Sequence, residues 1–454
     1  MPFQKVLVAN RGEIALRVIR ACRELGILTV AVYSECDANS LHVRFADESV
    51  CIGPPQASGS YLRVSNVISA ADITGADAIH PGYGFLAENA SFAQVVADHG
   101  MTFIGPSVEH LGVFGDKLSA KAAARDAGLP LIPGSEGSIA EIEEAVRIAA
   151  TIAYPVMLKA ALGGGGKGMR VVRDESELRR VFELTSTEAA AAFGNGEVFL
   201  ERFLPNPRHV EVQVAGDLFG NARHFFERDC SMQRRHQKVL EEAPAPNLPD
   251  GLAERIREAA AQLVGSVGYH TVGTCEFLVE GDSFFFLEVN PRIQVEHPVT
   301  ELITGVDLIQ LQIRLAAGER MPFEQEDIQC DGHAIEARIN AEHPFTFVPS
   351  PGRITGYYLP GGPGVRVDSA VHEMAMVQPY YDSLIAKLSC WAPTREQAIA
   401  KMQGALHEAV VEGIHTTIPL HRELLAHDVF LEARMSTKFL DAWLKERGTE
   451  TLDA

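Results

Sequence analysis

The sequence has few cysteines, and their spacing does not indicate a metal site or a disulfide framework. Seven cysteines are scattered over 454 residues, and no two form a Cys-x-x-Cys pair. This distribution favours reduced thiols and a cytoplasmic location. Cys230 could be interpreted as a nucleophile, but a buried structural thiol is the more common case, because no histidine partner can be assigned to it.

Long apolar segments and excess positive charge are also missing. No window approaches the roughly 18 consecutive apolar residues of a membrane span, and the first residues lack the pattern of a signal peptide. Forty Lys and Arg residues stand against 60 Asp and Glu, giving a formal charge of −20, which disfavours nucleic acid as a partner. We therefore expect a globular protein that binds any anionic ligand in a local basic pocket.

The N-terminal segment alternates between strand and helix patterns. Residues 5–9 are typical of a strand, a helix follows Gly12, and residues 28–33 are typical of a second strand. This order predicts a parallel α/β lobe. The turn at Gly12 lacks the G-x-G-x-x-G series of dinucleotide-binding proteins, so a structural lobe is the simpler interpretation.

A glycine run interrupts the next part of the chain. Helices are predicted over 117–127 and 139–150, with strands over 155–160 and 198–201. Between these strands lie four consecutive glycines, Gly163, Gly164, Gly165 and Gly166. Such a run costs backbone entropy unless the backbone must approach a ligand closely, and its amides could bind phosphates. A flexible linker is the alternative.

Two predicted strands, 274–279 and 283–289, carry oxygen ligands. The intervening Glu-Gly-Asp indicates a hairpin, and side-chain alternation places Glu288 and Asn290 on one face of the second strand. With Glu276 on the first strand, three oxygens could converge on Mg²⁺ or Mn²⁺ bound to nucleotide phosphates. A solvated sheet face is the alternative for any one of these residues.

Arg292 and Glu296 follow the hairpin four residues apart, and such a pair can hold a small anion. Arg292 offers a planar fork for bicarbonate, and Glu296 could act as a general base. A surface salt bridge between them is the alternative. Arg338 lies in a predicted strand, 333–340, where an exposed polar face would explain it equally well. The most basic stretch, 228–238, favours an internal anion site in so acidic a protein.

These segments together resemble the biotin carboxylase branch of the ATP-grasp enzymes. The matching segments follow one another along nearly the whole chain: 9–15, 80–86, the glycine run, 228–238, 241–244, 288–301, 332–340 and 379–383. The resemblance implies an α/β and α+β fold of the ATP-grasp type. Its parts would be a Rossmann-like N-terminal lobe over 1–115, an ATP-grasp domain over 116–330 with a lid at about 131–203, a C-terminal domain over 331–447 and a tail over 448–454.

The resemblance implies a ligase that uses ATP and bicarbonate to carboxylate biotin through carboxyphosphate. ATP and two Mg²⁺ or Mn²⁺ ions would be its cofactors. The sequence has no Met-Lys-Met biotinylation motif, so biotin is expected on a separate carrier protein and the second half-reaction on a carboxyltransferase subunit. No nucleic acid or membrane partner is expected. Acetyl-CoA, propionyl-CoA, pyruvate and 2-oxoglutarate all remain open as final acceptors.

The resemblance also assigns residues to ligands. ATP would be bound by the glycine run and by Lys117, Lys159, Glu201, Leu204, His209, Gln233, His236, Glu276 and Glu288. The metals would be held by Glu276, Glu288 and Asn290. Bicarbonate would be bound by Lys238, Arg292, Gln294, Val295 and Glu296, and biotin by Tyr83 and Arg338. The catalytic residues would be Lys238, Arg292, Glu296 and Arg338. A homodimer surface would include Arg17, Arg20, Glu24 and Arg366.

Two other functions share part of this pattern. A carboxylate–amine ligase of the ATP-grasp type would use the glycine run and metal carboxylates, but it would not need Arg292, Glu296 and Arg338 together. A non-catalytic ATP-binding subunit would be favoured if the metal or base positions were substituted, yet all of them are present.

Overall fold

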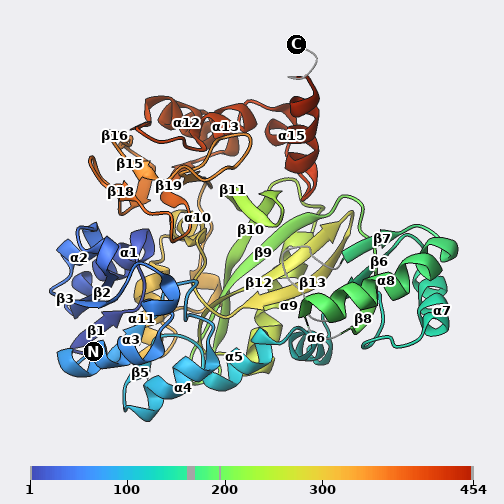
Figure 1. The fold of residues 1–454 in the computed structure, drawn as a ribbon, viewed down its shortest axis with the longest axis horizontal. Coiled ribbons are helices and arrows are strands. Elements are labelled where there is room, and N and C mark those ends of the chain that lie inside the picture. The colour runs from blue at the N-terminus through green and yellow to red at the C-terminus, as the bar shows by residue number, and fades with distance from the viewer. Residues whose placement is uncertain (1–2, 161–168, 194–195, 451–454) are drawn as a thin grey trace.

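The computed structural model describes residues 3–160, 169–193 and 196–450. The glycine run at 163–166 lies outside these described residues. The described chain forms an N-terminal lobe, a small projecting subdomain, a large central sheet and a C-terminal region stacked on that sheet (Figure 1). No helix in the described ranges combines the length and apolar character needed to cross a membrane.

The N-terminal lobe is built on a five-stranded parallel sheet in the order β3-β2-β1-β4-β5. Its strands are β1 Lys5–Val8, β2 Leu28–Ser34, β3 Glu48–Gly53, β4 Ala78–His80 and β5 Thr102–Phe103. Helix α1 Gly12–Glu24 packs on one face, and α3 Val64–Thr74 and α4 Ala90–Asp98 pack on the other. The predicted parallel α/β lobe is therefore confirmed.

The small subdomain has a three-stranded sheet in the order β7-β6-β8. These strands are β7 Met169–Val172, β6 Val156–Ala160 and β8 Val198–Arg202, and helices α7 Ile142–Ile152 and α8 Glu175–Phe193 pack against them. The helix predicted from residue 139 begins only at Ile142, because the amide of Ile139 donates to the carbonyl of Val198 and extends the sheet instead. Helix α6 Lys117–Asp126 precedes this subdomain.

The central sheet has eight antiparallel strands in the order β13-β12-β9-β10-β11-β14-β19-β17. Their bounds are β9 Arg208–Gly216, β10 Ala222–Arg234, β11 Gln237–Ala243, β12 Thr271–Glu280, β13 Ser283–Asn290, β14 His333–Asn340, β17 Val365–Ser369 and β19 Leu384–Ala392. The predicted hairpin is β12–β13, and the predicted strand at 333–340 is β14. The sheet runs without a break from β11 to β14 across the proposed domain boundary at 330–331.

Several helices cover the central sheet. Helix α9 Leu252–Ser266 packs under β9 and β10, whereas α10 His297–Thr304 and α11 Leu308–Ala316 lie between the sheet and the N-terminal lobe. Helix α12 Arg395–Glu408 packs on β19, and α15 Phe439–Glu450 contacts β10. The sequence pattern predicts a helix over 395–412, but α12 ends at Glu408, because β20 Val410–Glu412 pairs with β16 Gly356–Tyr358.

Candidate active site

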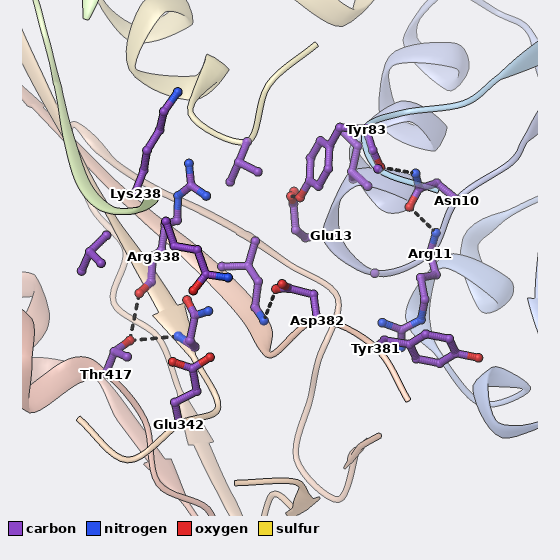
Figure 2. A pocket seen from close by; sticks show the side chains of 18 of the residues that line it. Asn10, Arg11, Glu13, Tyr83, Lys238, Arg338, Glu342, Tyr381, Asp382 and Thr417 are labelled. Carbon is purple, nitrogen blue, oxygen red and sulfur yellow. Dashed lines mark hydrogen bonds between the residues drawn. The ribbon is translucent and has the colours of Figure 1, made fainter. Parts of the chain in front are cut away.

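A cavity of about 400 Å³ lies where the N-terminal lobe, the central sheet and the C-terminal region meet. Tyr83 and Glu13 line one wall, and Lys238 and Arg338 lie across from them (Figure 2). The guanidinium of Arg11 lies 4.1 Å from the ring centre of Tyr381, which ties the N-terminal wall to the C-terminal one. The cavity therefore depends on the packing of all three parts.

Lys238 is the electrostatic centre of this region. Its ammonium bonds to Glu276 at 2.8 Å, to Glu296 at 2.7 Å, and also to Glu211. All three carboxylates are buried, and the lysine is 10% exposed. Burial opposes the charged form, but the three carboxylates raise the pKa of Lys238 well above its ordinary value. The ammonium therefore stays charged and holds together carboxylates from β9, from β12 and from the loop before α10.

Arg338 lines the cavity next to Lys238, whereas Glu296 is buried beside both cations. Arg338 donates to Glu241 at 2.5 Å and to Glu296 at 2.8 Å. Burial by itself would raise the pKa of Glu296, but the charges of Lys238, Arg338 and Arg228 hold it well below its usual range. The alternative of an exposed sheet face for Arg338 is wrong, because its side chain is only 17% exposed and bonds to the buried carboxylates of Glu241 and Glu296.

The three oxygen-bearing residues of the hairpin lie close to one another. Glu276 lies opposite Glu288 in the β12–β13 register, and the Asn290 amide donates to Glu276 at 2.9 Å. Burial and the charge of Glu276 raise the pKa of Glu288, whose carboxylate accepts no hydrogen bond from the described residues. A divalent cation would neutralise this concentration of negative charge. The donor set therefore fits a metal, although the Asn290 oxygen now accepts from Arg292 at 3.0 Å.

The residues assigned to the nucleotide come from the small subdomain, from α6 and from β9 and β10 of the central sheet. Lys159 on β6 and Lys121 on α6 both pair with Glu201 on β8. His209 lies 3.0 Å from Glu276, and Gln233 is buried on β10. Lys117 begins α6, Leu204 is buried after β8, and His236 is exposed in the β10–β11 turn.

The basic stretch 228–238 turns inward rather than toward solvent. Arg228 is completely buried and bonds to Glu211 at 2.7 Å and to Gln294 at 2.9 Å. The Gln294 amide in turn donates to Glu276 at 2.8 Å. Cys230 is buried, and burial raises the pKa of its thiol well above the ordinary value, which does not suit a nucleophile.

Arg292 and Glu296 do not pair with each other. Arg292 bonds to Glu88 at 2.6 Å and lines the cavity, whereas Glu296 is buried between Lys238 and Arg338. The alternative of a surface salt bridge between them is therefore wrong. Val295 lies between these positions, and its carbonyl accepts a hydrogen bond from Lys387 at 2.8 Å.

Four residues of this region were not predicted from the sequence: Glu211, Glu241, Lys121 and Glu13. For Glu211 a signal was present, because His209, Glu211 and Gln213 alternate with valines along β9 and so project from one face. Glu241 and Glu13 also offered a signal, because they lie in the matching segments 241–244 and 9–15. Lys121 lies in none of these segments and reaches Glu201 across a long sequence separation.

The residues assigned to a dimer surface lie together, apart from the cavity described above. Arg17, Arg20, Glu24 and Arg366 line one surface depression. Arg17 and Arg366 both bond to Glu301, at 2.9 Å and 2.6 Å.

The sequence matches three domain families in order. They are the biotin carboxylase N-terminal domain over 2–111, the ATP-binding domain of the carbamoyl-phosphate synthase L chain over 116–324, and the biotin carboxylase C-terminal domain over 336–442. The biotin carboxylase of Pseudomonas aeruginosa is 53% identical over 440 residues, which cover 97% of this chain and 98% of that protein. The chain belongs to the biotin carboxylase family.

Other relatives agree with this assignment. A pyruvate carboxylase subunit of Methanothermobacter thermautotrophicus is 51% identical over 97% of this chain and 90% of its own length. The biotin carboxylase domain dimer of Hydrogenobacter thermophilus 2-oxoglutarate carboxylase, crystallised with magnesium ADP and bicarbonate, superposes with a TM-score of 0.90 at 49% identity, covering 97% of both chains. This member of the biotin carboxylase family has the predicted ATP-grasp fold and is a ligase that carboxylates biotin with ATP, bicarbonate and a divalent metal.

Proposed function

We propose that the Lys238–Glu296–Arg338 group carries the carboxylation chemistry. The observation behind this proposal is that Glu296 bonds to both Lys238 and Arg338, at 2.7 and 2.8 Å, between the hairpin carboxylates and the cavity. Bicarbonate would bind to Lys238, Arg292, Gln294 and Val295, and biotin would enter the cavity beside Tyr83 and Arg338. Both substrates would then meet at Glu296.

Glu296 is proposed as the base that deprotonates bicarbonate. It is ionised in the structure, but its low pKa makes it a weak base while both cations bond to it. Bound phosphate and bicarbonate would compete for Lys238 and Arg338, and weakening these bonds would raise the basicity of Glu296. Arg338 is then placed to stabilise the negative charge that develops on the ureido oxygen of biotin.

The nucleotide side of the site is proposed to run from Lys117 and Lys159 to the hairpin. Glu276, Glu288 and Asn290 would hold Mg²⁺ or Mn²⁺, which offsets phosphate charge when bound. Lys159 now pairs with Glu201, so ATP phosphates would draw this lysine away from that partner. Glu201, Leu204, His209, Gln233 and His236 would contact the adenine and ribose, and the glycine run would complete the phosphate site.

Relatives that are carboxylase subunits or domains support external partners. We infer that biotin arrives on a carrier protein, that a carboxyltransferase subunit completes the reaction, and that Arg17, Arg20, Glu24 and Arg366 contribute to a homodimer surface. All seven cysteines are free thiols, which supports a cytoplasmic location.

The proposal is tested by measuring ATP hydrolysis with Mg²⁺ and labelled bicarbonate, with and without free biotin. Biotin should stimulate hydrolysis and label should appear in carboxybiotin. Glu296→Gln, which keeps the side chain's shape, should lower both rates by about 10²- to 10⁴-fold, the range for loss of a general base. Glu227→Gln is the matched control, because Glu227 is equally buried in the sheet but pairs with Arg257 away from the cavity. Equal rates for both variants would contradict the role of Glu296.

A further inference from the structure

Lys387 is a completely buried lysine that the proposed chemistry does not use. It lies on β19, and its side chain has 0% exposure. Its ammonium donates to the Val295 carbonyl at 2.8 Å and lies 3.2 Å from Glu13 Oε2 and 3.9 Å from Asp368 Oδ2. Burying an ammonium is costly unless its donors find partners, so these contacts define where it lies.

The sheet register places Lys387 beside Arg338, which lines the cavity. It is directly opposite Arg338 across β14 and β19, and directly opposite Asp368 across β17 and β19. Directly opposed residues on antiparallel strands project from the same face. Arg338, Lys387 and Asp368 therefore form one row, and the Arg338 end of this row lines the cavity.

The contacts of Lys387 lead to both proposed substrate positions. Val295 belongs to the bicarbonate group, and its carbonyl is held directly. Glu13 is 6% exposed, near the start of α1, and its other carboxylate oxygen accepts a hydrogen bond from the Tyr83 hydroxyl beside the biotin cavity. One ammonium thus links the N-terminal lobe, the loop that carries Glu296 and the C-terminal part of the sheet.

We propose that Lys387 is a positioning residue that sets the separation between the bicarbonate and biotin sites, by holding the Val295 carbonyl directly and Tyr83 through Glu13. This inference rests on the proposed roles of Val295 and Tyr83. Carboxyphosphate formed from ATP and bicarbonate must transfer its CO₂ to biotin before water returns it to bicarbonate and phosphate. A shift of about 1 Å in such an arrangement can reduce a rate by roughly 100-fold.

The test compares ATP hydrolysed with carboxybiotin formed in the full-length chain and in Lys387→Met. ATP cleavage continues when the two sites are misaligned, but its product is lost to water. We therefore expect the ratio of ATP to carboxybiotin to rise by about tenfold or more, with higher KM values for bicarbonate and biotin. The Kd for ATP, measured by calorimetry, should be unchanged, because Lys387 does not contact the proposed nucleotide residues.

Two further variants separate positioning from charge balance. Arg395→Met removes another cation of the C-terminal part, one that is 13% exposed and pairs with buried Glu242, and it should lower the Tm without changing the ratio. Lys387→Met combined with Glu13→Gln removes the carboxylate that would otherwise be left unpaired, so its Tm should recover while the ratio stays high. A normal ratio in the double variant, or in Lys387→Met itself, would overturn the proposal. An unmodified chain that forms no carboxybiotin would instead refute the proposed function and the inference together.

Discussion

Replacing Arg228 with methionine should destabilise the central sheet strongly, because this cation is completely buried next to the site. Its side chain has 0% exposure, as does that of Glu211, with which it forms an ion pair at 2.7 Å. It also donates to Gln213 at 2.7 Å and to Gln294 at 2.9 Å. Two further bonds reach the hydroxyls of Thr274 and Thr300. Methionine fills a similar length but satisfies none of these acceptors.

The magnitude follows from the groups left behind. Removing one partner of a buried ion pair costs about 3–5 kcal/mol, because the remaining charge is buried without compensation. Lys238 still contacts Glu211, which limits the loss of stability. The amide oxygens of Gln213 and Gln294 would be left without a donor, which increases that loss. We expect about 4 kcal/mol in total. For a cooperative unit of 150–250 residues this corresponds to a fall in Tm of roughly 8–16 °C.

Differential scanning calorimetry measures this fall directly. Arg170→Met is the control, because Arg170 pairs with Glu188 where their side chains are 37% and 50% exposed, and such pairs contribute about 1 kcal/mol or less. If Arg228→Met lowers the Tm no more than Arg170→Met does, burial does not make the Arg228 network costly to break, and the reasoning is wrong.

Two further predictions concern carboxylates with raised pKa values. Burial raises the pKa of Glu241 to about 7, so between its ordinary value of 4.5 and about 7 the folded state binds more protons than the unfolded state. The free energy of unfolding should therefore fall by about 3 kcal/mol as pH rises through this window. Urea titrations at pH 5 and 7.5 should show this fall in the unmodified protein but not in Glu241→Gln. The same pH dependence of stability in both proteins would contradict the prediction. Glu288→Gln should leave the Tm without metal unchanged or higher but reduce the increase caused by Mn²⁺ and ATP, whereas Glu188→Gln should keep the full increase.

Much of the fold could be predicted from local sequence patterns. The β1–α1–β2 unit, the β12–β13 hairpin and β14 follow from apolar periodicity and turn residues, which act over short distances. The errors lie where distant segments decide the structure. Ile139 pairs with Val198 of β8 rather than starting a helix. The residues after Glu408 are not helical, because β20 pairs with β16.

The site shows the same division. Glu276, Glu288 and Asn290 converge because one hairpin brings them together, so their spacing was informative. The partners of Arg292 and Glu296 could not be read from their separation of four residues, since Glu88, Lys238 and Arg338 reach them from other parts of the chain. A four-residue spacing favours a contact between two side chains within a helix, and α10 begins after Glu296.

The ion pairs of the proposed site would explain how an acidic protein can bind several anions. Lys238, Arg338 and Lys159 are each neutralised by internal carboxylates, so no long-range positive field is needed to keep them charged. An anion that bound to these cations, as proposed, would displace Glu296 or Glu201 from them. Each displaced carboxylate regains basicity or becomes available to a metal. Binding of ATP and bicarbonate would then also activate the base, because these anions would replace Glu296 and Glu201 as partners of the same cations.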